Sequence, residues 1–219
     1  MKLVYILCEG QTEESFVNEL MYSSFFEKGI VLIPIICHTK REPSGIKHKG
    51  GGATYGKIHN ELIKLCRSKK SSTVTMLFDY YALPHDTPGM DTLPIGSSLD
   101  KILHLEDHIG QDIAAENFIP NIVMHEFEGL LFSEPEAFSY CGLSQVDIHT
   151  LQNIRNTFTT PEDINDGLET APSKRILDIH PSYSKVRDGI NIARDIGLYT
   201  ISSECKHFNG WLARLSQKG

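Results

Sequence analysis

The sequence predicts an α/β fold built around a parallel sheet and followed by a helical C-terminal extension. Four short apolar runs, over residues 3–8, 30–37, 73–78 and 118–124, have the length and the bounding residues of strands. The first run is continuously apolar rather than alternating, which is typical of a strand covered on both faces in a parallel sheet. Helical patterns separate the runs, so we expect right-handed parallel crossovers between successive strands.

The elements of the first half follow from local signals. Residues 12–28 are predicted to form a helix, because apolar side chains recur at helical spacing and Gly29 follows as a stop. Pro34 lies in the second apolar run and lacks an amide donor, so that strand is expected at an edge of the sheet or at a bulge. Residues 55–70 show another amphipathic helical pattern before the third strand.

The later elements are predicted in the same way. Residues 82–97 are rich in proline and glycine, which indicates an irregular loop above the end of the sheet. A helix is expected over 98–116, ahead of the fourth strand, and the pattern is mostly helical from Ser133 onward. We therefore predict an α/β core over residues 1–132 and a helical extension over residues 133–219 that packs on this core.

The composition narrows the class of protein. At 219 residues and 40% hydrophobic content, the chain is long enough to bury one sizeable core. Its net charge of −7 argues against a surface coated with Lys and Arg for nonspecific nucleic-acid binding, although it permits a local basic groove. The five cysteines include no C-x-x-C pair, so neither a disulfide framework nor a thiolate zinc site is expected. This cysteine usage indicates a protein of the reducing cytoplasm. We expect no membrane partner, because the first apolar run stops at Glu9, far short of the roughly 20 residues that a membrane helix needs.

A basic segment follows the second strand. Residues 39–57 carry five Lys or Arg residues, among them Lys49, together with three successive glycines and a single acidic residue. One interpretation is a solvated surface connection, since loops are usually polar. The other is a clamp that binds phosphates, in which Lys49 is a candidate substrate-binding residue.

Acidic residues follow three of the four predicted strands. Glu9 comes after the first strand, Asp79 after the third, and Glu126 and Glu128 after the fourth. Because ligand sites in parallel sheets gather beyond the carboxyl ends of the strands, these carboxylates are expected to converge there. Crowded carboxylates must be protonated, paired with Lys or Arg, or bridged by a cation, and hard oxygen ligands suit Mg²⁺ or Mn²⁺. The alternative for each residue alone is a polar loop position without chemistry.

A divalent cation at this edge would support phosphoryl transfer, because it neutralises phosphate charge and lowers the pKa of a bound water. His125, next to Glu126, is a candidate proton shuttle, since imidazole titrates near neutrality; a packed histidine is the alternative. The rings of Tyr80 and Tyr81 either stack on a base or a sugar or pack at the sheet edge.

Two groups of cations lie in the C-terminal extension. Lys174 and Arg175 are candidates for holding a scissile phosphate while charge builds on it, or they are ordinary solvated charges. The later cations Lys185 and Arg187 are interpreted as surface charges.

The motifs that carry these residues resemble a known family. A Glu-Gly pair after the first strand and an aspartate after a later strand are similar to the Toprim domain of primases, topoisomerases and overcoming-lysogenization-defect nucleases. The chain as a whole more closely resembles a Toprim-like bacterial family catalogued as a domain of unknown function. The matching segments are CEGQTEESFV (8–17), FDYYALP (78–84), HEFEGLLF (125–132), APSKR (171–175), CKHF (205–208) and WL (211–212).

This resemblance implies a Toprim-like, mostly parallel four-stranded sheet flanked by helices. It implies that Glu9 is a general acid/base or a metal ligand and that Asp79 is a metal ligand. Toprim enzymes usually carry a second aspartate two residues later, where this chain has Tyr81. A tyrosine, with an ordinary pKa near 10, does not replace a carboxylate ligand at neutral pH. Either Glu126 or Glu128 supplies the missing ligand, or the metal site is weakened.

Three functions are compatible with these observations. The first is a divalent-metal-dependent phosphodiester hydrolase, a DNA or RNA nuclease; its setting in bacterial defence or a mobile element, beside a separate ATPase, is implied by the resemblance alone. The second is a catalytically weak or inactive binding module that docks on a partner ATPase. The third is a site for a nucleotide or a small phosphoester. The sequence has no G-x-x-x-x-G-K-[ST] loop, which argues against a P-loop NTPase.

Overall fold

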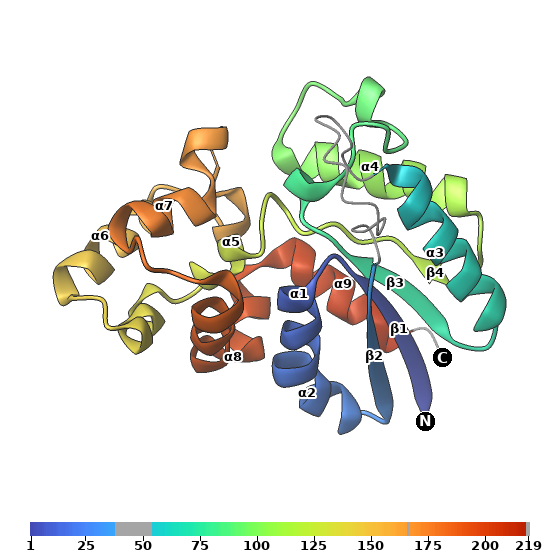
Figure 1. Ribbon diagram of the computed structural model, residues 1–219, viewed down its shortest axis with the longest axis horizontal. Helices are drawn as coiled ribbons and strands as arrows, with labels where there is room; N and C mark the ends of the chain where they lie inside the picture. Colours follow the sequence, from blue (N-terminus) through green and yellow to red (C-terminus); the bar gives the residue numbers. More distant parts are fainter. Residues whose placement is uncertain (38–53, 166, 218–219) are drawn as a thin grey trace, which may run out of the picture.

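A parallel four-stranded sheet in the order β2-β1-β3-β4 lies at the centre of the structure, a computed structural model that describes residues 1–37, 54–165 and 167–217 (Figure 1). Its strands are β1 (Lys2–Cys8), β2 (Ile30–Ile36), β3 (Thr73–Leu77) and β4 (Phe118–Ile119). All paired strands run parallel. The predicted α/β class, with helices around the sheet and a helical C-terminal region, is confirmed.

The two faces of the sheet bury different helices. Val4, Ile6 and Cys8 of β1 share one apolar cluster with the first helix and the last, while Leu7 and Met76 point to the other face. The first face is covered by α1 (Gln11–Phe16), α2 (Tyr22–Phe26) and α9 (Lys206–Gln217), and the second by α3 (Tyr55–Ser68) and α4 (Ser98–Ile113) (Figure 1). Burial on both faces explains why the first strand reads as a continuous apolar run.

The predicted first helix is present, with a change of pitch in its middle. A π-helical turn over Val17–Met21 joins α1 to α2. Gly29 ends the segment with a φ of 75°, a conformation that favours glycine. Among the described residues, the next strand, β2, pairs with β1 alone and places Pro34 opposite Ile6, so the predicted edge position is confirmed.

The fourth strand is shorter than predicted. β4 ends before Pro120, whose nitrogen has no hydrogen to donate to the ladder. The side chain of Asn121 instead donates to the carbonyl of Met76 (3.2 Å). The chain then meets β3 again at a parallel bridge between Asp79 and Val123, where Val123 N donates to Phe78 O (2.8 Å). The residues after 124 therefore still arrive at the carboxyl end of β3.

The C-terminal part is mostly helical and shares its apolar core with the N-terminal part. Its helices are α5 (Glu128–Leu131), α6 (Gln145–Asn156), α7 (Pro172–Ile179), α8 (Ile190–Glu204) and α9. Phe16 of α1 packs 5.9 Å from Phe208 of α9, measured between ring centroids. The division at residue 132 stays a prediction, and no described helix is long and apolar enough to cross a membrane.

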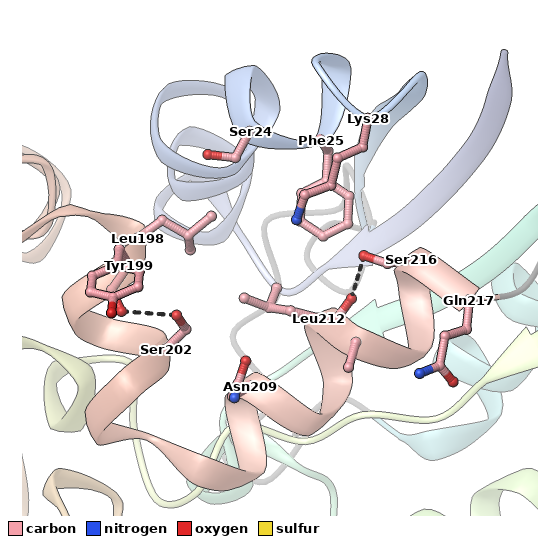
Figure 2. Close-up of a pocket in the computed structure, with 11 residues that line it drawn as sticks. Ser24, Phe25, Lys28, Leu198, Tyr199, Ser202, Asn209, Leu212, Ser216 and Gln217 are labelled. Atoms are coloured by element: carbon pink, nitrogen blue, oxygen red, sulfur yellow. Dashed lines mark hydrogen bonds between the residues drawn. The ribbon is translucent and has the colours of Figure 1, made fainter.

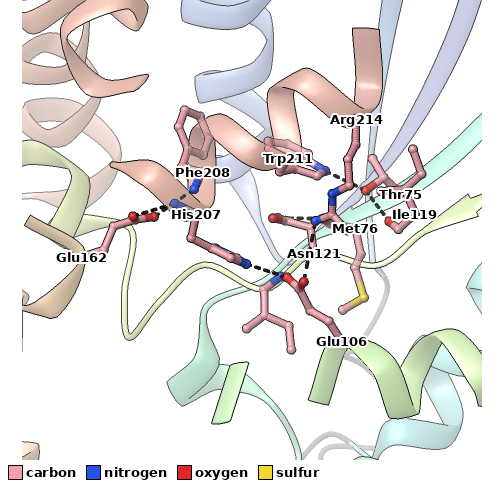
Figure 3. Close-up of polar contacts among 11 residues, drawn as sticks. Thr75, Met76, Glu106, Ile119, Asn121, Glu162, His207, Phe208, Trp211 and Arg214 are labelled. Carbon is pink, nitrogen blue, oxygen red and sulfur yellow. Dashed lines mark hydrogen bonds and ion pairs between the residues drawn. The ribbon is translucent and has the colours of Figure 1, made fainter. Parts of the chain in front are cut away.

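Two buried glutamates fix α9 to the rest of the molecule, and with His207 we call them the α9 anchor (Figure 3). Glu162 accepts hydrogen bonds from the backbone N–H groups of His207 (2.9 Å) and Phe208 (3.0 Å), the first turn of α9. Glu106 accepts from Ile122 N (2.9 Å) and lies 3.0 Å from His207 Nε2. The two bonds to Glu162 satisfy helix N–H groups that have no partner within the helix.

Candidate active site at the strand ends

Asp79 is held in place at the carboxyl end of β3. Its side chain is buried, and its Oδ1 accepts a hydrogen bond from Phe127 N (2.9 Å). Its own N–H lies 3.4 Å from Oε2 of Glu9, which follows β1. The neighbouring parallel strands β1 and β3 therefore bring these two predicted site residues into contact.

Glu13 lies beside them, in the first turn of α1. Its Oε2 accepts a hydrogen bond from Gly10 N (3.0 Å), which closes the start of the helix. Its Oε1 is buried and has no hydrogen-bond partner among the described residues. Buried carboxylate oxygens are normally hydrogen-bonded, so this oxygen depends on a nearby charge instead.

A lysine from the C-terminal part lies among these carboxylates. Nζ of Lys185 is 2.7 Å from Asp79 Oδ2, 3.4 Å from Glu13 Oε1 and 3.6 Å from Glu128 Oε2. Lys185 opens the π-helical turn Lys185–Gly189, which runs directly into α8. Its side chain remains 31% exposed, so the ammonium group borders solvent. We call Glu9, Glu13, Asp79, Glu128 and Lys185 the acidic rim.

Burial dominates the electrostatics of the acidic rim. It raises the pKa of Glu9 to about 7, with further contributions from the charges of Asp79 and Glu13. Burial likewise raises the pKa of Glu128 to about 7 and that of Asp79 to about 6, although Lys185 opposes both shifts. Burial alone would lower the pKa of Lys185, but the nearby carboxylates outweigh it and raise that pKa. One ammonium thus contacts three carboxylates, with Glu9 nearby, and a second cation would be attracted to them.

The side chains of Glu126 and Glu128 contact different parts of the chain. Its Oε2 accepts a hydrogen bond from Ser173 N (3.0 Å), in the first turn of α7. Lys174, the next residue, is exposed. The side chain of Arg175 is engaged: its Nε donates to Thr170 O (2.7 Å), and its guanidinium lies 5.5 Å from the ring centroid of Phe158. Lys49 lies outside the described residues.

His125 is buried next to Tyr81 rather than within the acidic rim. Its Nδ1 lies 3.2 Å from the side-chain nitrogen of Asn165, which also donates to the hydroxyl of Tyr81. Burial lowers the pKa of His125, which keeps its imidazole neutral at physiological pH. A proton-shuttle role for His125 stays a prediction.

The donor chemistry of the acidic rim fits a hard divalent cation. Glu9, Glu13 and Asp79 offer carboxylate oxygens, and one of these, Glu13 Oε1, has no hydrogen-bond partner within the described part of the chain. Within the described residues, no group of three or more His, Cys, Asp or Glu side chains is placed so that it could hold a metal ion in the present arrangement. The Lys185 ammonium instead lies where these carboxylates meet.

Lys185 and Glu13 are the site residues that sequence reasoning missed. Lys185 is 106 positions from Asp79, and nothing in its local sequence sets it apart from a surface lysine. Glu13 lies in the first turn of a helix, where an acidic residue commonly does no more than complement the helix dipole. Its spacing of four residues from Glu9, across a turn that starts a helix, is the signal that could have found it.

A cavity elsewhere in the molecule lacks comparable chemistry. It measures about 450 Å³ and lies between α2, α8 and α9, where Phe25, Tyr199 and Leu212 line it (Figure 2). None of its lining residues is an acid, a histidine or a cysteine. This cavity therefore offers no acid/base or metal-ligating group of these types.

Comparison with known proteins places the chain in a family. No curated protein matches it. A solved structure, the C-terminal region of the OLD protein of Xanthomonas campestris pv. campestris, is 17% identical, with 96% of each chain covered and a TM-score of 0.38, a likeness too distant to bear on fold or function. The relation to Toprim domains stays a prediction. The chain belongs to the family described as Domain of unknown function (DUF4276), whose profile matches residues 8–216.

Proposed function

We propose that the acidic rim is the active site of a divalent-metal-dependent phosphodiester hydrolase that acts on nucleic acid. The observation that carries this proposal is the meeting of Glu9, Glu13 and Asp79 beside two neighbouring strand ends, where the buried Oε1 of Glu13 is held by an ion pair with Lys185 Nζ at 3.4 Å rather than by a geometric hydrogen bond. Burying several carboxylates together is unfavourable unless something compensates their charge. A single lysine ammonium compensates only part of it.

Each residue of the acidic rim has a role in this proposal. Glu9, Glu13 and Asp79 would hold Mg²⁺ or Mn²⁺, which when bound would neutralise phosphate charge and activate a water. The bond from Phe127 N fixes the orientation of Asp79. The alternative role for Glu9 is that of a general acid/base instead of a metal ligand, because a carboxyl group with a pKa of about 7 can accept and release a proton near neutrality. Lys185 borders solvent and can stabilise the negative charge that builds on a phosphate.

The biological setting comes from the motif resemblance. Toprim-like motifs support a DNA or RNA nuclease of a bacterial defence or mobile-element system, working in the cytoplasm beside a separate ATPase. In this setting Glu126 stays a candidate metal ligand, with its Oε2 accepting a hydrogen bond from Ser173 N of α7. Glu128 remains a candidate ligand through its proximity to Lys185.

A second function, a catalytically inactive module that docks on an ATPase, is favoured by one observation. The Lys185 ammonium already lies between the carboxylates, in contact with Glu13, Asp79 and Glu128. A lysine in this position can replace a metal ion as the cation that stabilises the fold. The tyrosine at position 81, where Toprim enzymes usually carry a second aspartate, agrees with this alternative.

Thermal unfolding with and without Mn²⁺ tests the hydrolase proposal. A ligand that binds only the native state raises the melting temperature, so millimolar Mn²⁺ should raise it in the wild type and in Glu136→Gln, an exposed control. Glu9→Gln and Asp79→Asn should lose the rise while remaining folded, and both should lose Mn²⁺-dependent hydrolysis of single-stranded and duplex DNA and RNA. Absence of both the rise and hydrolysis in the wild type would contradict the proposal.

Lys185→Gln separates the two functions. If the rim is a hydrolase, this variant should keep its response to Mn²⁺ and lose about 100-fold in hydrolysis rate, because a charge that stabilises the transition state is gone. If the lysine replaces a metal, Mn²⁺ should leave the melting temperature of the wild type unchanged. Lys185→Gln should then gain a Mn²⁺-dependent rise in melting temperature. Metal binding and turnover are measured separately, so the two results cannot be confused.

A further inference from the structure

Three aromatic rings form a cluster directly beside the acidic rim. The turn Tyr80–Ala82 follows Asp79 without an intervening residue, and His125 directly precedes Glu126. Ring centroids are 5.7 Å apart for Tyr80 and Tyr81, 5.7 Å for Tyr81 and His125, and 6.4 Å for Tyr80 and His125. Both tyrosines are partly exposed, whereas His125 is buried behind them. We call these three residues the aromatic cluster.

Asn165 fixes the orientation of the aromatic cluster. Its side-chain oxygen accepts a hydrogen bond from Gly167 N (2.9 Å), so its NH₂ group faces Tyr81 and His125. His125 Nδ1 is therefore the acceptor, and the proton of the neutral ring lies on Nε2. That Nε2 is buried and has no hydrogen-bond partner among the described residues. An unpartnered buried donor is rare and indicates a place that a ligand or water completes.

The backbone of the aromatic cluster is held in an uncommon conformation. His125 has a φ of 61°, in the left-handed region that residues other than glycine seldom adopt. Its carbonyl accepts a hydrogen bond from Tyr81 N (3.2 Å), which ties the two segments together. Such conformations cluster at functional sites, where surrounding structure maintains them. The rings are thus positioned in advance rather than free to move.

We propose that the aromatic cluster binds an unpaired nucleobase of the substrate, stacked on the exposed parts of Tyr80 and Tyr81. This inference rests on the proposed function, because it places the base beside a phosphodiester held at the acidic rim. Stacking on tyrosine needs a free face of the base, which a single strand or a frayed end offers and an intact duplex does not. The net charge of −7 agrees, since duplex binding through the backbone depends on clustered basic residues.

A fluorescent base reports this contact without turnover. A short single strand containing 2-aminopurine is titrated with the protein in EDTA, and stacking on tyrosine should quench its fluorescence. Tyr81→Leu should bind about tenfold more weakly, because one stacking contact is lost. Tyr81→Phe, which keeps the ring, should stay within about twofold of the wild type. Tyr199→Leu, at an exposed tyrosine on α8, should match the wild type and serves as the control.

Three results would overturn the inference: no quenching in the wild type, equal binding by wild type and Tyr81→Leu, or equal binding of the single strand and its duplex. Tyr80→Leu provides a second test if Tyr81→Leu does not fold. The response to Mn²⁺ is independent of these rings, so it distinguishes this inference from the proposed function. Quenching without any Mn²⁺ response or hydrolysis would leave a base-binding module, and a Mn²⁺ response without quenching would leave a hydrolase that lacks this subsite.

Discussion

The acidic rim and the α9 anchor are two clusters of buried carboxylates that differ in how their oxygens are partnered. In the α9 anchor, Glu162 accepts two backbone hydrogen bonds, and Glu106 accepts one from the backbone and contacts His207. In the acidic rim, the ammonium of Lys185 is shared by three carboxylates, and one oxygen of Glu13 has no hydrogen-bond partner within the described residues.

This difference separates structural acids from candidate catalytic ones. Burial raises the pKa of Glu162 as it does those of Glu9 and Glu128, so a raised pKa does not distinguish the two clusters. The partners do. Backbone N–H groups are fixed and leave Glu162 little capacity for another ligand, whereas the acidic rim keeps oxygens that can bind a further cation. We infer that the first cluster maintains the fold and the second carries the chemistry.

The largest expected effect is on turnover. Asp79→Asn should lower the rate of phosphodiester hydrolysis by about 100-fold or more, because a charged ligand is replaced by a neutral one that keeps the bond to Phe127 N. Glu162→Gln should remain within about twofold of the wild type when corrected for folded protein. Initial rates in Mn²⁺ measure both. Equal losses in the two variants would break the distinction between the clusters.

The reverse ranking is expected for stability. Glu162→Ala should lower the free energy of unfolding by about 3 kcal/mol, since two backbone N–H groups at the start of α9 lose their acceptor. Glu9→Gln should change it by no more than about 1 kcal/mol, because the charge it removes is partly unfavourable in the folded state. Urea unfolding gives both values. A Glu9→Gln variant less stable than Glu162→Ala would show that the acidic rim is a structural cluster.

The pH dependence of stability sharpens the same comparison. The pKa of Glu9 is raised from 4.5 to about 7 by burial, so folding favours its protonated form. The stability that this proton contributes is fully present below about pH 4.5 and is lost as the pH rises through about 7. The melting temperature of the wild type should therefore fall, relative to that of Glu9→Gln, across this window. A constant difference between the two curves would exclude a raised pKa at Glu9.

The smallest effect is expected from an exposed cation at the edge of the site. Lys174→Ala should raise the KM for a nucleic-acid substrate about twofold, because a solvent-exposed charge interacts weakly. The difference should vanish at about 0.5 M salt, where such charges are screened. Rates at low and high salt provide the measurement. A tenfold effect that persists at high salt would instead place Lys174 in direct contact with the substrate.

Local patterns predicted most of the sheet, because strands and helices leave periodic apolar signals. Pro34 identified the edge strand by its missing donor, and strand-end positions brought Glu9 and Asp79 together as expected. The predicted length of the fourth strand was wrong. The strand ends after two residues, because Pro120 has no N–H to donate and the side chain of Asn121 then donates to the carbonyl of Met76. The expected membership in a family of unknown function is confirmed.

The missing parts of the site depend on contacts that no local pattern encodes. The positions of Lys185 and Asn165 are set by how the C-terminal part packs against the sheet. Lys185 contacts Asp79 from 106 positions away and Asn165 contacts Tyr81 from 84 positions away, so spacing within a segment does not reveal these contacts. Glu126 and Glu128 also diverge, because the chain turns into α5 between them and directs only Glu128 to Lys185.

The position of Lys185 late in the chain sets the order in which the molecule is completed during synthesis. At typical elongation rates of about 5–20 residues per second, the ribosome releases Asp79 roughly 5–20 s before Lys185. During that interval the nascent N-terminal half carries its carboxylates without their counter-ion. A chain truncated before residue 185 never acquires this counter-ion. The lysine thus links assembly of the acidic rim to synthesis of the C-terminal part.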